Sequence, residues 1–329
     1  MKSFFGKLSS LFNFTSARYP KDSATEPAQI TQSKVLVLVY DPVMDPTTGA
    51  TLSQSMKWYR IADLVTGFLA DLILVSNGMA RYQLVQRIDV DEFPAKIDGF
   101  RYTPQTYMNM LRGAKSPRLP KEVSYDAVLR KYNILRRVAA HEIDEVWIFG
   151  FPHAGFYEST MGGPGAFWCN APPLKGTEAS KRRFVIMGFS YERYIGEMLE
   201  AYGHRAESIM EKTFSKSAGD ANLWKRFIRY DLAAPGRAAC GDVHFAPNSQ
   251  REYDWNNTGP VLSECYDWSL NFPNFKGDVR AVATSEWGNG DMRKHHTWWL
   301  NHFPRVAGRR NGIHNNWWQY VVNPNNVVL

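Results

Sequence analysis

Residues 184–211, FVIMGFSYERYIGEMLEAYGHRAESIME, form the stretch that decides the fold of this chain. The run 184–189 is almost wholly apolar, which is typical of a buried strand. In the residues that follow, apolar side chains recur at helical spacing at Ile195, Met198, Leu199, Tyr202, Ala206 and Ile209. A buried strand that leads into an amphipathic helix is the repeating unit of α/β proteins, so we expect this fold class.

Other parts of the sequence repeat this pattern of strand and helix. Strands are expected over residues 35–40, 82–90 and 146–151, each closed by a nearby proline. Helices are expected from residue 61, from residue 124, over 191–211 and over 221–231. Strands separated by helices predict a mainly parallel sheet, Rossmann-like or flavodoxin-like, with helices on both of its faces.

Glycine-rich phosphate loops are missing from the expected positions. No Gly-x-Gly-x-x-Gly follows the first strand, and Gly162-Gly163-Pro164-Gly165 follows a loop instead of opening a helix after a strand. A dinucleotide or nucleoside triphosphate site of the common kinds needs such a loop at a helix start. The sequence therefore predicts no cofactor of these types.

The chain divides into three segments by composition. Residues 1–33 combine an amphipathic stretch with a linker rich in Ser, Thr, Pro and Ala, and this stretch either docks on the body or makes weak contact with a membrane interface. Residues 34–234 carry the α/β pattern. Residues 235–329 are loop-rich, with a short helix near 291–302, and we expect them to pack on the core.

Tryptophan is concentrated in the last segment. It occurs there among Asn, Gly, Asp and Pro at Trp255, Trp268, Trp287, Trp298, Trp299, Trp317 and Trp318. Most of these rings are expected in the core, because a loop-rich segment has little else with which to exclude water. One or two exposed rings beside amides would instead suit the stacking of a sugar, which makes glycan binding an alternative function.

Size and composition exclude several classes of protein. With 329 residues, 44% of them hydrophobic, the chain can bury a large core and is not disordered as a whole. Its net charge is +7, yet no zinc-finger spacing or RNA-binding strand motif accompanies the basic clusters, so no specific nucleic-acid partner is expected. No apolar run approaches the roughly 18 residues of a membrane span, and no secretory signal is recognisable. We expect a soluble protein, cytoplasmic by default.

Cysteine is scarce. Cys169, Cys240 and Cys265 are too few and too scattered for a disulfide scaffold, and none belongs to a C-x-x-C pair. Cys240 and Cys265 would be bridged in an oxidising compartment and free in a reducing one, and both alternatives stay open.

Polar residues follow three of the expected strands. Asp41 comes after the first, His153 and Glu158 after the third, and Glu192 after the fourth. The carboxyl ends of parallel strands meet at one edge of a sheet, where ligands collect. These four side chains are therefore candidates for general acid/base catalysis. The alternative is that Asp41 caps a turn and Glu192 caps the helix that follows it.

The expected helix 191–211 carries a polar stripe opposite its apolar face. Glu200 and His204 are four residues apart, the spacing with which two side chains of one helix share a metal ion such as zinc. His244, in a loop with Asp242 and Asn248, could complete such a site. The alternative is a stripe that simply faces water.

The sequence thus favours a hydrolase, with or without a metal ion, whose carboxylates and histidines act at the strand ends on a small-molecule, peptide or glycan substrate. A non-catalytic glycan-binding or surface-interaction protein is the second alternative. A structural or assembly protein without a small-molecule site is the third.

Overall fold

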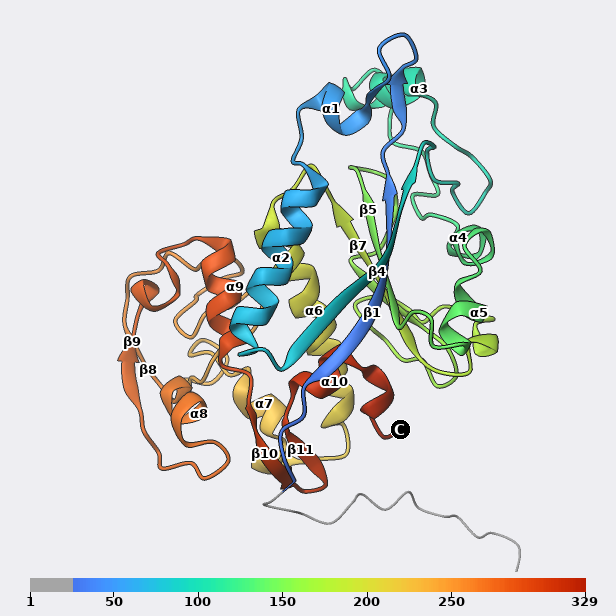
Figure 1. The fold of residues 1–329 in the computed structure, drawn as a ribbon. Helices are drawn as coiled ribbons and strands as arrows, with labels where there is room; N and C mark the ends of the chain where they lie inside the picture. The colour runs from blue at the N-terminus through green and yellow to red at the C-terminus, as the bar shows by residue number, and fades with distance from the viewer. Residues whose placement is uncertain (1–25) are drawn as a thin grey trace, which may run out of the picture.

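The computed structural model describes residues 26–329, and the amphipathic stretch expected near the N-terminus lies outside them. At its centre is a five-stranded sheet of order β4-β1-β5-β7-β6 (Figure 1). Its strands are β1 (Thr31–Tyr40), β4 (Ala80–Val90), β5 (Glu145–Gly150), β6 (Ser159–Gly162) and β7 (Phe184–Ser190). All neighbours pair in parallel except β6 and β7, which are antiparallel, so the expected mainly parallel sheet is confirmed.

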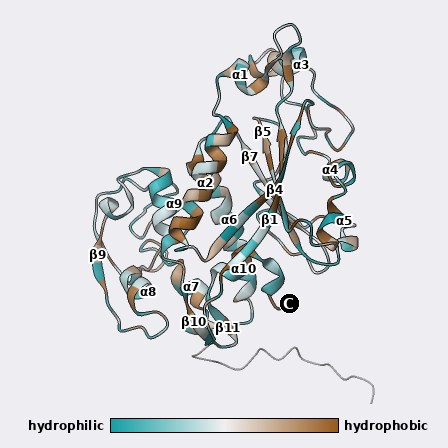
Figure 2. Ribbon diagram, viewed as in Figure 1, coloured by the Kyte–Doolittle hydropathy of each residue, from teal (hydrophilic) through white to brown (hydrophobic). Residues whose placement is uncertain are grey.

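The interior strands are apolar because both faces of the sheet are covered. Leu38 of β1 lies opposite Ile148 of β5, which in turn lies opposite Gly188 of β7. Every residue of β5 is buried, as is typical of parallel strands between two layers of helices. Figure 2 shows these strands as a hydrophobic centre of the molecule. The continuous apolar runs of the sequence therefore mark the core.

Helices cover the two faces of the sheet in separate groups (Figure 1). On one side α2 (Ile61–Val75), α6 (Ile195–Thr213) and α9 (Met292–Asn301) pack against one another. On the other side lie α4 (Tyr125–Lys131) and α5 (Ile134–Ala139). The short elements β2 (Val43–Asp45), β3 (Ala50–Thr51), α1 (Leu52–Met56) and α3 (Pro104–Leu111) lie beyond the carboxyl ends of the strands.

Several elements differ from the sequence expectation. The single helix expected from Ser124 is divided into α4 and α5 at Asn133, which has a left-handed φ of +51°. Helix α6 begins at Ile195 and not at residue 191. Strand β6 was expected to be loop, because its four residues, STMG, show neither an apolar run nor a clear alternation. Helix α7 covers only Leu223–Phe227, whereas a helix over 221–231 was expected. It ends early because the backbone N–H groups of Ala239 and Gly241 donate to the Arg229 carbonyl, which draws the chain into an irregular loop.

The C-terminal segment contains short elements joined by loops. They are β8 (Val261–Ser263), α8 (Cys265–Asn271), β9 (Arg280–Val282), β10 (Arg305–Arg310), β11 (Ile313–Asn316) and α10 (Trp318–Val322), with α9 among them. Six of its seven tryptophans are buried and Trp298 is half-buried. Phe227 of α7 lies 5.1 Å from Trp268 and 5.4 Å from Trp317 between ring centroids. Cys240 and Cys265 are buried and free.

No helix within residues 26–329 combines the length and apolarity that a membrane crossing requires.

A buried ion pair joins α6 to the centre of the sheet. Arg205 donates to both carboxylate oxygens of Glu145 at 3.1 and 2.8 Å, and both side chains are almost inaccessible to solvent. The remaining guanidinium bonds reach the carbonyls of Val321 and Val322 in α10, and the Trp147 indole also donates to Glu145. One charge pair therefore ties β5, α6 and α10 together. Removing two charges from water costs free energy, and the fold tolerates it only where each charged group keeps its hydrogen-bond partners.

Histidines of the α9 region are buried and uncharged. His295 and His296 are fully buried, and His302, the residue that follows α9, is 7% exposed. Burial lowers the pKa of His296 and of His302 to about 4. Nδ1 of His302 bonds to the Trp298 carbonyl at 2.8 Å. These rings are therefore neutral packing groups at pH 7.

Removing one partner of the buried pair should destabilise the protein strongly. We expect Arg205→Met to lower the free energy of unfolding by about 3–5 kcal/mol, because it leaves the Glu145 carboxylate buried and unpaired. The double variant Arg205→Met/Glu145→Leu should recover most of that loss. Urea denaturation followed by circular dichroism measures both, with Arg237→Met, which removes an exposed ion pair to Asp220, as the nearly neutral control. A single variant no less stable than the double variant would contradict a tightly coupled pair.

The buried histidines should make the protein less stable in mild acid. An unfolded histidine has a pKa of about 6.5, so the unfolded state binds more protons between that value and the folded pKa, and stability falls as the pH drops from 7 to 5. For His302 alone the loss at pH 5 is about 2 kcal/mol. His302→Gln, which keeps a donor for the Trp298 carbonyl, should reduce the difference between denaturation midpoints at pH 7 and pH 5. An unchanged difference would show that His302 is not neutral in the folded state.

Candidate metal centre

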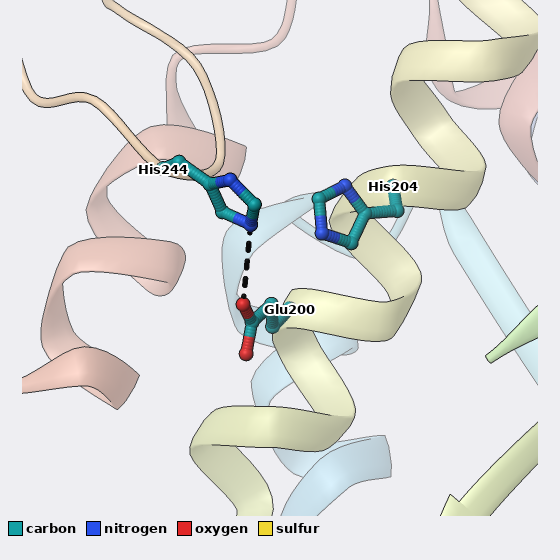
Figure 3. A group of neighbouring side chains, drawn as sticks. All are labelled: Glu200, His204 and His244. Carbon is teal, nitrogen blue, oxygen red and sulfur yellow. Dashed lines mark ion pairs between the residues drawn. The ribbon is translucent and has the colours of Figure 1, made fainter. Parts of the chain in front are cut away.

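Three side chains converge beside α6 (Figure 3). Glu200 and His204 project from this helix and His244 from the loop after α7. One ligand atom of each residue lies within 4.8 Å of the other two, and within residues 26–329 this is the one such group of three or more His, Cys, Asp or Glu side chains. His244 Nε2 lies 3.3 Å from Glu200 Oε1. The structure thus brings together the three residues for which the sequence suggested a metal.

The polar stripe of α6 is covered at Glu200 and partly covered at His204 and Glu207, whereas Glu211 near its end faces water. Glu200 is only 7% exposed, and the loop that carries His244 lies over it. The loop can approach because residue 203 is glycine: a Cβ there would lie 2.5 Å from Val243 Cγ2. Gly203 therefore weakens the helix slightly but lets His244 come close to Glu200 and His204.

Glu207 fixes both the loop and the ring of His204. Its Oε1 accepts from the Val243 N–H at 3.1 Å, and its Oε2 lies 2.9 Å from His204 Nδ1. With Nδ1 bonded to a carboxylate, His204 presents Nε2 toward Glu200 and His244, as Figure 3 shows. A carboxylate behind a histidine is the usual outer-shell arrangement of metal sites, because it sets the tautomer and orients the ring.

Asp242 shapes the turn that presents His244. Its Oδ1 accepts from the N–H groups of His244 and Phe245, both at 2.9 Å. Burial, with the nearby charge of Glu207, raises the pKa of Asp242 to about 6. The carboxylate is thus held close to the negative charge of Glu207, which favours a cation at this place.

Glu200, His204 and His244, called the triad below, shift one another's pKa values. The hydrogen bond to Glu200 raises the pKa of His244 despite burial. Burial lowers the pKa of His204, but the bond to Glu207 outweighs it and the net pKa is raised. Burial raises the pKa of Glu200, but His244 and other positive neighbours bring it below its usual value. The site therefore favours positive charge, which either protons or a metal ion can supply.

A tyrosine that the sequence analysis did not single out completes this group. The Tyr253 hydroxyl donates to Glu200 Oε1 at 3.1 Å and lies 3.1 Å from His244 Nε2. Tyr253 is nine residues beyond His244 in an irregular loop, where no periodicity predicts which side chains will meet. Its place beside Asp254 and Trp255 gave no signal of this contact.

The residues expected at the strand ends separate into two sets. His153, Glu158 and Glu192 are exposed and line a cleft of about 520 Å³ beyond β5 and β7. Glu158 and Glu192 also line a second cleft of about 480 Å³ that includes Glu200 and Tyr253. These two carboxylates therefore border the same cleft as Glu200, which is the one residue of the three that lines it.

Asp41 does not join them. It is absent from the lining of both clefts, and its carboxylate accepts from the Ser53 N–H at 2.8 Å and from the Ser53 hydroxyl at 2.7 Å. It thereby holds the start of α1 against the end of β1. This is close to the turn-capping alternative that the sequence left open for Asp41.

Comparison with known proteins assigns no relative to this geometry: no described protein family, no curated protein and no solved structure matches the chain.

Proposed function

We propose that Glu200, His204 and His244 bind a divalent metal ion such as zinc, and that the protein is a metal-dependent hydrolase. The observation that carries this proposal is the convergence of two imidazoles and one carboxylate within 4.8 Å. The helix that supplies two of them is fixed by the Arg205–Glu145 pair, and the turn that supplies His244 is fixed by Asp242. Two histidines and one glutamate are a ligand set of catalytic zinc sites, in which a fourth position serves water or substrate.

The surroundings of the triad support metal binding over a purely structural polar cluster. The positive neighbours needed to balance Glu200 and Glu207 are the two imidazoles themselves. His204 already has the outer-shell carboxylate that metal-bound histidines use. A cation would take the place of the protons that these rings otherwise share with the carboxylates.

The adjoining cleft supplies groups for hydrolysis. A bound zinc ion lowers the pKa of its water and polarises a substrate carbonyl or phosphoryl group. Glu158 is the best candidate for general base, because it lines both clefts and its charge acts on His204 and Tyr253. Glu192 also lines both clefts, and His153 lines the first of them only. The cleft volumes suit a small molecule or a short piece of peptide or glycan.

Removal of a ligand should abolish tight metal binding while the fold survives. Protein stripped with a chelator and titrated with Zn²⁺ by calorimetry should bind one ion per chain. Glu200→Gln and His204→Ala should weaken binding by more than the roughly 10- to 100-fold that outer-shell changes cause. Glu211→Gln, an exposed change on the same helix, is the matched control and should bind zinc like the parent protein.

Two results would contradict the proposal. One is a stripped parent protein that takes up no zinc, cobalt or manganese. The other is equal affinity in Glu200→Gln, His204→Ala and Glu211→Gln, which would place the ion elsewhere. Circular dichroism of each variant separates loss of the site from loss of the fold.

A further inference from the structure

We propose that Tyr253 is a fourth protein ligand of the ion in the resting protein, and that its hydroxyl must exchange for water before hydrolysis can begin. This inference rests on the proposed metal site. It adds a regulatory step: the site would be closed until the tyrosine turns away.

The spacing of three donor atoms carries the inference. Tyr253 Oη lies 3.1 Å from Glu200 Oε1 and 3.1 Å from His244 Nε2, and the latter two atoms are 3.3 Å apart. Ligand atoms of a tetrahedral zinc ion with bonds of about 2.0–2.1 Å are roughly 3.3–3.4 Å from one another. The three atoms therefore already form a triangle close to one face of a coordination tetrahedron. A ring nitrogen of His204 lies within 4.8 Å of a ligand atom of Glu200 and of one of His244.

Packing holds the tyrosine hydroxyl at this corner. The ring of Tyr253 lies 4.6 Å from that of His244 and 5.3 Å, edge to face, from that of Trp255, measured between centroids. The backbone N–H of Tyr253 donates to the His244 carbonyl at 3.0 Å. Residue 253 also adopts a φ of +60°, a conformation that side chains other than glycine and asparagine seldom take. Local strain of this kind persists where surrounding contacts impose it.

A bound cation changes what the hydroxyl can bond to. It would occupy Glu200 Oε1 and His244 Nε2, the two atoms that the hydroxyl contacts. The hydroxyl must then either release its proton to solvent and bond to the ion as a phenolate, or leave. The hydroxyl oxygen already lies about as far from Glu200 Oε1 and His244 Nε2 as two ligands of one ion lie from each other. Coordination therefore needs little movement of the ring or backbone.

Four protein ligands close a zinc site, whereas catalysis needs an open position. Tyr253 can vacate its position because it is 48% exposed and lines the cleft that Glu158 and Glu192 border. In the exchange one bond from the ion to the phenolate oxygen breaks and one to water forms. The departing phenolate takes a proton from that water, which leaves hydroxide on the ion, and no electrons are transferred. A substrate that fills the cleft and displaces the ring would thereby switch the site on.

Copper(II) is a suitable probe, because a coordinated phenolate gives it a visible charge-transfer band that carboxylate and imidazole ligands do not produce. The stripped parent protein with one equivalent of Cu²⁺ should show this band, and Tyr253→Phe should bind the ion without it. Tyr59→Phe, which alters an exposed tyrosine of the same cleft, is the control and should keep the band. We also expect Tyr253→Phe to bind Zn²⁺ more weakly than the parent protein, but by less than Glu200→Gln or His204→Ala, because water can take the vacated fourth position.

The outcomes separate the two proposals. Stoichiometric binding of copper and zinc at Glu200, His204 and His244 without the band, and with equal zinc affinity in Tyr253→Phe, would overturn the role of Tyr253 and leave the metal site standing. A parent protein that binds neither ion would overturn both. If Tyr253→Phe fails to fold, resonance Raman spectra of the copper-loaded parent decide the matter, since tyrosinate modes must be enhanced if Tyr253 is a ligand and absent if it is not.

Discussion

The buried pair of Arg205 and Glu145 sets the orientation of α6, on which the candidate site depends. Arg205 points into the sheet and reaches β5 and α10. His204 is the preceding residue, so it is turned by about 100° around the helix, and Glu200 is one turn earlier on the same side. Once Arg205 is fixed inside, the triad face must look toward the loop that carries His244. The structural ion pair of Arg205 and Glu145 thereby positions the residues of the candidate metal site.

Most of the sheet could be predicted from the sequence because its strands are buried on both faces. Runs such as 184–189 cannot be solvated, and the prolines and glycines beside them mark their ends. Strand β6 could not be predicted, since its four residues owe their conformation to pairing with β7. The shortened α7 has a similar cause: bonds to the Arg229 carbonyl from residues ten and more positions later compete with helix formation. Local sequence patterns do not show hydrogen-bond partners that are distant in the sequence.

The sequence predicts that Glu200 and His204 lie on one helix face, but it does not predict that the loop with His244 covers them. Glu200 and His204 share a helix face by simple periodicity, whereas the closeness of His244 depends on the long-range bond between Glu207 and Val243 and on the missing side chain of Gly203. Tyr253 and Arg205 were missed for the same reason, because their partners are distant in sequence. The glycine next to His204 is the local signal in the sequence that another segment approaches the helix closely here. Asp41 shows the converse, a polar strand-end residue whose partner, Ser53, is structural.

The proposed chemistry of this protein depends on an ion between Glu200, His204 and His244. Crystals of the full chain soaked in zinc, with diffraction data collected on either side of the zinc absorption edge, test it most directly. We expect one strong anomalous peak within about 2.0–2.2 Å of a Glu200 oxygen and of one nitrogen from each histidine. Data with no peak at this place, or with peaks only on exposed surface carboxylates, would contradict it.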